Sequence, residues 1–123
     1  MTLLEALRQT LVDQNVQSVY LLSVSPEICP AVVLRSYASR SEIDIPIGRQ
    51  SIQCFIRATS FPESEQIAWK CFKTFADLHH SNLADRFIYS VILHQEPFYL
   101  EKDERNQYLH IFNFDVLCRH KEV

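Results

Sequence analysis

The fold is decided by residues 50–78, QSIQCFIRATSFPESEQIAWKCFKTFADL, in which an alternating pattern gives way to a helical one. From Gln50 to Thr59, apolar residues occupy every second position, which is typical of a strand with one buried face. The predicted buried face consists of Ile52, Cys54, Ile56 and Ala58. The opposite face carries Ser51, Gln53, Phe55 and Arg57. We expect this second face to be available for contacts.

A helix is predicted directly after this strand. Ser60 and Glu63 form a capping box around Pro62, and acidic residues in a first turn interact favourably with the helix dipole. The apolar stripe then recurs at helical spacing through Ala68, Cys71, Phe72, Phe75 and Leu78. We expect the helix to pack this stripe on the sheet and to end near His80.

Working outward toward the N-terminus, the sequence predicts one more helix and two more strands. A capping box of Thr2 and Glu5 opens a helix that runs to about Gln14. Two segments rich in Val, Leu and Tyr then predict strands over Val16–Val24 and Ala31–Tyr37.

Toward the C-terminus, strands are predicted over Phe87–His94 and about Gln107–Cys118, paired antiparallel. The polar segment Ala38–Arg49, which contains Pro46 and Gly48, is expected to be an exposed loop. The order α-β-β-β-α-β-β predicts one α+β domain over residues 1–123, in which two helices cover a mixed or mostly antiparallel sheet.

Composition excludes several classes of protein. With 123 residues, 47% of them hydrophobic, the chain can bury a full core, while a single glycine excludes glycine-rich phosphate loops. The formal charge of −3 argues against binding of duplex nucleic acid. No apolar run reaches the roughly 20 residues of a membrane helix, and the N-terminus lacks a signal-peptide pattern. We expect the protein to stay where it is translated.

Cysteine and histidine spacing predicts no metal and no cofactor. The cysteines are irregularly spaced at Cys29, Cys54, Cys71 and Cys118. We expect the last three to be reduced core thiols. His79 and His80 are adjacent on a helix, so their side chains point about 100° apart. His94 and His110 could meet across paired strands, but such pairs are usually polar sheet surface.

Three arrangements could carry chemistry, and each has a simpler interpretation. Cys71 could act as a thiol with His79 or His80 as its base, but eight or nine residues of helix separate them by about 12 Å or more, which is too far for proton transfer. The acids Glu101, Asp103 and Glu104 lie beside Lys102 and Arg105 and are expected to form a solvated turn. An aromatic platform for single-stranded nucleic acid would need Phe55, Trp69, Phe98, Tyr99 and Tyr108 together with Arg57. Packing explains these aromatic residues more simply.

Several landmarks follow one another along the chain: Ile52-Gln53, Arg57-Ala58, Glu96-Pro97-Phe98, Leu100, Asp103-Glu104 and Phe112-Asn113-Phe114-Asp115-Val116. Their order resembles the minor capsid and tail terminator proteins of long-tailed bacteriophages. In that family, a strand with the pattern vQ-x-x-x-Ra runs into a helix, and a P-x-x-l-x-x-D-E-x-x-R turn precedes an f-x-x-N-f-x-v strand. This sequence departs from the pattern because Arg105 directly follows Glu104 and the glycine often found in that turn is absent.

The resemblance implies a structural protein of a phage or prophage tail, without enzymatic activity, assembled in the bacterial host cytoplasm. It implies a ring of identical subunits, usually a hexamer, whose partners are the tail tube protein and the head–tail connector protein. No membrane and no specific nucleic acid are implied as partners. The residues we expect at the interface are Gln53, Phe55, Arg57, Asp103, Glu104 and Arg105.

Two alternative functions stay open at this point. The first is a head–tail connector or completion protein, which would differ in ring number and would touch DNA in the channel. The second is a small ligand-binding or hydrolytic domain, with its site between the loop Ala38–Arg49 and the turn Glu101–Arg105.

Overall fold

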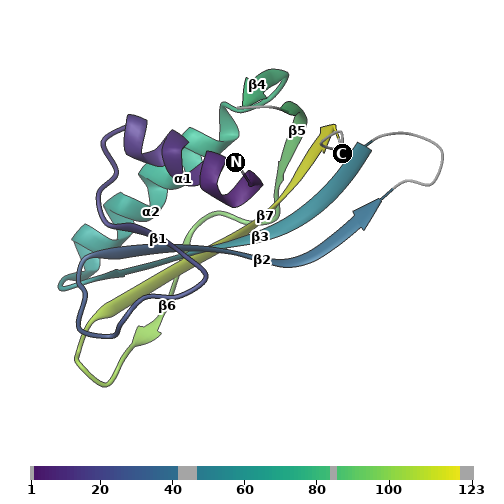
Figure 1. Ribbon diagram of the computed structural model, residues 1–123. Coiled ribbons are helices and arrows are strands. Elements are labelled where there is room, and N and C mark those ends of the chain that lie inside the picture. Colours follow the sequence, from purple (N-terminus) through teal and green to yellow (C-terminus); the bar gives the residue numbers. More distant parts are fainter. Residues whose placement is uncertain (1, 42–46, 84–85, 120–123) are drawn as a thin grey trace.

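The computed structural model describes residues 2–41, 47–83 and 86–119, and in these residues two helices lie on a seven-stranded sheet (Figure 1). This architecture confirms the predicted α+β class and the order of the main elements. The elements in chain order are α1 (Leu3–Asp13), β1 (Val19–Leu21), β2 (Ala31–Ser41), β3 (Ile47–Ala58), α2 (Phe61–Ala76), β4 (Ser81–Leu83), β5 (Arg86–Leu93), β6 (Phe98–Lys102) and β7 (Tyr108–Arg119).

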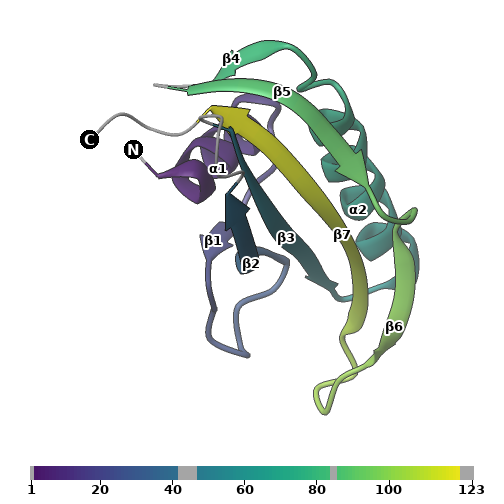
Figure 2. The same ribbon diagram turned by 90° about the vertical axis from the view of Figure 1, so that its right-hand side faces the viewer.

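The sheet is mixed and strongly curled (Figure 2). Its strand order is β1-β2-β3-β7-β5-β4, and every pair is antiparallel except β1 with β2. β7 pairs with β3 along one side, while β5 and then β6 pair along the other. The predicted antiparallel pairing of the last two main strands is therefore confirmed. β7 is the strand that ties the two halves of the sheet together.

Both helices lie on the same face of the sheet (Figure 1). The predicted buried face of β3 is confirmed, since Ile52, Cys54, Ile56 and Ala58 are all fully buried. The stripe of α2 is confirmed as well, with Ala68, Cys71 and Phe75 buried and Phe72 and Leu78 partly buried against them. Alternate residues of β7 complete this core: Phe112, Phe114, Val116 and Cys118.

The starts of both helices follow the capping residues in the sequence. Thr2 Oγ1 accepts from the Glu5 N–H at 3.1 Å, and Glu5 Oε1 accepts from the Thr2 N–H at 3.1 Å. Ser60 Oγ accepts from the Glu63 N–H at 3.3 Å. The predicted end of the second helix near His80 is wrong, because α2 ends at Ala76 and the chain turns back into β4.

The prediction of an exposed loop over residues 38–49 is wrong in the part that the structure describes. β2 continues to Ser41 and β3 begins at Ile47, and residues 42–46, including Pro46, lie outside the described residues. These strand ends are polar because they extend beyond the helices, so no apolar alternation marks them (Figure 1). A register shift between Ser36 and Ala38 accommodates the extension.

The first strand is shorter than predicted, and two short strands were not predicted. β1 spans only three residues, because Ser18 and Leu22 on either side adopt positive φ angles of 57° and 72°. β4 and β6 have three and five residues. β4 is too short to show an alternating pattern, and the sequence of β6, FYLEK, does not alternate.

Candidate functional site

In the part of the chain that the structure describes, one face of the sheet carries no helix, and the predicted contact residues lie on this helix-free face (Figure 1). In the register of β3 with β7, Ser51 lies opposite Asp115, Gln53 opposite Asn113, Phe55 opposite Ile111 and Arg57 opposite Leu109. These residues alternate with the core residues of the same strands. Each end of this helix-free face has a polar feature of its own.

At one end the face is hollowed by a depression of about 550 Å³. It lies between the segment joining β1 to β2 and the β6–β7 hairpin, which both project at the lower end of the sheet in Figure 2. The lining residues are Pro26, Phe55, Arg57, Glu101, Lys102, Asp103, Glu104, Arg105 and Leu109. Five of the six predicted interface residues therefore meet here, and only Gln53 does not line the depression.

Arg57 is far less accessible than the sequence suggested. Its strand face is the expected one, but the side chain is only 7% exposed. One cause is the segment before β2, where the carbonyl oxygen of Ser25 accepts from Arg57 Nη2 at 3.1 Å. The Nε of Arg57 is buried and has no hydrogen-bond partner among the described residues. Sequence alternation placed the residue but could not show the segment that covers it.

Asp103 organises the turn between β6 and β7. Its Oδ1 accepts from the backbone N–H groups of Arg105 at 2.8 Å and Gln107 at 2.9 Å. Asn106 adopts a φ of 58°, the left-handed conformation for which glycine is common and asparagine is tolerated. The turn thus forms without a glycine, because Asn106 takes the left-handed conformation, and Glu104 and Arg105 are exposed on it.

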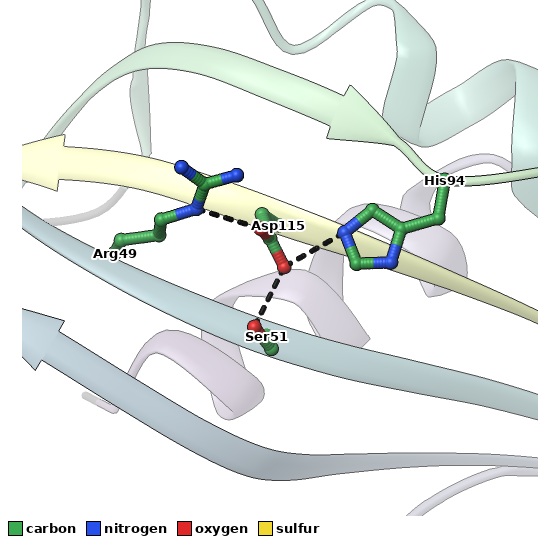
Figure 3. A network of polar contacts seen from close by, with 4 residues as sticks. All are labelled: Arg49, Ser51, His94 and Asp115. Carbon is green, nitrogen blue, oxygen red and sulfur yellow. Dashed lines mark hydrogen bonds and ion pairs between the residues drawn. The ribbon is translucent and has the colours of Figure 1, made fainter.

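At the other end of the helix-free face, Asp115 collects three side chains from neighbouring strands (Figure 3). Its Oδ2 lies 2.6 Å from Arg49 Nε, and its Oδ1 accepts from Ser51 Oγ at 2.7 Å. His94 Nε2 lies 3.0 Å from the same Oδ1. Burial alone raises the pKa of Asp115, but the hydrogen bonds from Ser51, Arg49 and His94 outweigh it and lower the pKa below its ordinary value.

This network contains Ser, His and Asp but is not arranged as a nucleophilic triad. In a triad the imidazole lies between the hydroxyl and the carboxylate and accepts the hydroxyl proton. Here the carboxylate of Asp115 lies between Ser51 and His94, and the Ser51 hydroxyl donates to that carboxylate. The arrangement fixes β3, β5 and β7 relative to one another. The signal in the sequence was an acid within the apolar run of β7, and the sequence analysis missed it.

The two histidines expected on paired strands do not meet. His94 lies on the helix-free face against Asp115, whereas His110 lies on the helix side, 2% exposed, with its Nδ1 2.7 Å from Ser64 Oγ. Burial lowers the pKa of His110, with Glu65 acting weakly in the opposite direction. Among the described residues, no group of three His, Cys, Asp or Glu side chains is placed to hold a metal ion.

The aromatic platform considered from the sequence is not assembled. Tyr99 and Tyr108 pack around Phe61 on the helix side, with ring centroids 5.3 Å and 6.2 Å from it. Trp69 instead contacts Phe72, and Phe55 lies on the opposite face of the sheet. Stacking of successive bases across these residues is therefore not possible in this structure.

The ligand site considered from the sequence, between residues 38–49 and 101–105, is not formed, because the two segments lie far apart along β7. Arg49, at the end of the predicted loop, lies opposite Leu117, whereas Glu101 in the predicted turn lies opposite Leu109. Eight residues of strand separate these positions, roughly 26 Å. The two segments thus cannot form one pocket.

In the described part of the chain, no helix is long and apolar enough to cross a membrane.

Comparisons with known proteins agree with this fold. One solved structure, titled "Virion of native gene transfer agent (GTA) particle", contains a chain that matches with a TM-score of 0.73 at 12% sequence identity. The match covers 95% of this chain and 94% of that chain, so the two share their fold. The search of curated proteins found no significant match. Residues 8–117 match the family described as bacteriophage tail terminator protein. Because this match spans most of the chain, the protein belongs to the bacteriophage tail terminator family and is a structural protein of the virion tail.

Proposed function

We propose that the protein closes the end of the tail tube and helps to join the tail to the head of a phage or prophage particle. Residues 1–123 act as a single tail-terminator-like domain that assembles with copies of itself into a ring, a hexamer as the family resemblance implies. The ring contacts the tail tube protein and the head–tail connector protein and works without catalysis. The observation that carries this proposal is the family match over residues 8–117.

An exposed sheet edge supports assembly. Within the described residues, β6 pairs only with β7, and its outer edge is unpaired. This edge strand exposes three consecutive large apolar residues, Phe98 at 43%, Tyr99 at 42% and Leu100 at 46%. An apolar edge of this kind tends to aggregate unless another surface covers it, and a subunit or a neighbouring tail protein would do so.

The depression supports the choice of interface residues. Glu104 and Arg105 are exposed on a turn that projects beside it, so both are accessible to a neighbouring protein. A rigid turn held by Asp103 presents them with little loss of conformational entropy on binding. We expect Arg105 and Glu104 to make charged contacts across the interface, while Asp103 contributes by holding the turn.

The test is a capping experiment with purified tail tubes that lack a terminator. Wild-type protein is expected to bind tube ends as a ring visible by electron microscopy and to prevent further tube extension. Arg105→Glu and Glu104→Lys should each lower the capped fraction about tenfold at equal concentration, since a reversed charge at an interface costs on the order of 1.4 kcal/mol. Lys73→Glu, which reverses a charge at an exposed position of α2, is the matched control, and this variant should cap tubes normally.

Three outcomes separate the possibilities. Normal capping by both turn variants would place the interface elsewhere on the protein. Failure of the wild type to cap tubes would overturn the terminator role. Binding of the wild type to tail-less heads in place of tubes would assign it the role of a connector.

A further inference from the structure

The depression contains a cation, Arg57, that forms no close ion pair within the described residues, although the exposed carboxylate of Glu27 acts on it at longer range. Arg57 lines the depression, and only 7% of the residue's surface is exposed. In residues 2–41, 47–83 and 86–119, no carboxylate forms an ion pair with it. One carbonyl oxygen, that of Ser25, accepts from Nη2, and Nε is unpartnered.

A mostly buried guanidinium in this state is energetically unfavourable. Buried charges in folded proteins are normally paired, because a charge removed from water loses its hydration. A single neutral carbonyl provides much weaker compensation than a carboxylate, which can bind two guanidinium N–H groups at once. The unpartnered Nε shows that the hydrogen-bonding capacity of this guanidinium is not met within the described residues.

We propose that the depression receives a peptide segment of a neighbouring tail protein, which places an Asp or Glu carboxylate against Arg57. This inference rests on the proposed function, since it names the chemistry of the partner at the same surface. The volume of about 550 Å³ is within the range of sites that bind small ligands, so it can hold one acidic side chain and its apolar neighbours.

The remaining lining residues define what else the segment carries. Phe55 and Leu109 supply an apolar floor beside Arg57, and Pro26 supplies an apolar wall. Arg105 on the rim is a second cation that can contact the same carboxylate. The depression therefore favours an acidic residue flanked by apolar side chains.

The acidic residues of the rim make the site selective. Glu101 and Glu104 are exposed there and repel a free anion, while the Asp103 carboxylate accepts two backbone N–H groups of its own turn. A segment that also buries apolar surface on Phe55 and Leu109 overcomes this repulsion, and a small carboxylate such as acetate does not. The site is thus expected to recognise a peptide rather than an anion alone.

The test uses two peptides that differ in one charge, acetyl-Leu-Glu-Leu-amide and acetyl-Leu-Gln-Leu-amide, with acetate as a third probe. The readout is the Nε–H signal of Arg57 in a ¹H–¹⁵N spectrum of the whole protein, assigned by its loss in Arg57→Lys. The Glu peptide is expected to shift this signal with saturation and to bind at least about fivefold more tightly than the Gln peptide or acetate. Arg105→Gln should weaken the Glu peptide more than the Gln peptide.

Equal shifts with both peptides, or none with the Glu peptide up to about 10 mM, would overturn the proposal, because even a weak specific site binds in this range. Acetate binding as tightly as the Glu peptide would also overturn it. Where Arg57→Lys fails to fold, the assigned backbone N–H signals of Phe55 and Leu109, which line the depression, give the same readout in the wild-type protein. Tube capping is measured separately: capping without peptide binding leaves the terminator role intact, and peptide binding without capping leaves the site intact.

Discussion

Asp115 Oδ2 lies 2.6 Å from Arg49 Nε, which joins the C-terminal half of β7 to the N-terminal part of β3 on the helix-free face. The carboxylate is buried, while Arg49 and His94 are partly exposed at its edge. A charge is retained within a mostly apolar strand because three side chains donate to it.

Asp115→Asn should therefore lower stability, by about 1–3 kcal/mol at neutral pH, because the amide cannot accept all three hydrogen bonds. The pKa of Asp115 is depressed below its ordinary value of 3.8, so its contribution is complete above that value and is lost as pH falls through the lower folded value. Urea unfolding measured across this acidic range should show a shallower loss for Asp115→Asn than for the wild type. Asp77→Asn, at an exposed acid, is the control, and an unchanged acid profile in Asp115→Asn would contradict the assignment.

Ser64→Ala should destabilise the protein by about 1–3 kcal/mol, because it leaves His110 Nδ1 buried without its partner 2.7 Å away. Ser36→Ala, on an exposed position of β2, should be nearly neutral. Thermal or urea unfolding of the two variants would decide this, and equal effects would show that the Ser64 bond contributes nothing.

The lowered pKa of His110 predicts a separate pH effect. The unfolded state binds a proton near the ordinary value of 6.5, whereas the folded state does so only at lower pH. Stability should thus be constant above about pH 7 and should fall as pH drops below 6.5 toward the folded pKa. His110→Gln should reduce this slope, and a slope equal to the wild type would exclude His110 as its source.

The core of α2 gives a graded prediction. Phe75→Ala should cost about 3–5 kcal/mol, because a fully buried ring is lost. Phe72 is only partly buried, so Phe72→Ala should cost less, about 1–2 kcal/mol, although both residues lie on the same predicted stripe. Lys73→Ala should be nearly neutral. A larger effect at Lys73 than at Phe75 in urea unfolding would contradict the packing of this helix.

Arg57→Glu should destabilise the isolated subunit by about 3 kcal/mol or more, because a carboxylate would be buried against the Ser25 carbonyl oxygen. The alternation of β3 predicted Arg57 on a face available for contacts, but the residue is only 7% exposed. Arg105→Glu, on the exposed turn, should change stability by no more than about 0.5 kcal/mol. A melting temperature of Arg57→Glu equal to that of the wild type would show that the side chain is not held in the buried position.

Elemental analysis of the purified protein should find no stoichiometric metal, and a chelator should leave its melting temperature unchanged. The reason is the histidine and cysteine spacing, together with the burial of Cys54, Cys71 and Cys118 as core thiols. Burial raises the pKa of the Cys118 thiol, which lowers its reactivity. One zinc per chain, or a large chelator effect, would contradict this prediction.

The sequence by itself determined the helices and strands that bury one face, because a single buried face produces a regular spacing of apolar residues. β3 and α2 each bury every second or every third to fourth residue, so Ile52, Cys54, Phe75 and the capping residue Ser60 could be identified from spacing alone. The order of elements and the family followed from the same landmarks. Local chemistry sufficed for these features because each depends on residues close together in the chain.

Only the tertiary structure decided what lies against the helix-free face. Asp115 draws its partners from positions 66 and 64 residues earlier, and Ser25 covers Arg57 from 32 residues away. The extension of β2 and β3 into the polar segment likewise depends on pairing with each other and with β7 rather than on a pattern of their own. Alternation along a strand tells which face a side chain takes, but the curl of the sheet and the long-range pairing determine whether that face is open, and these arise only when the whole sheet forms.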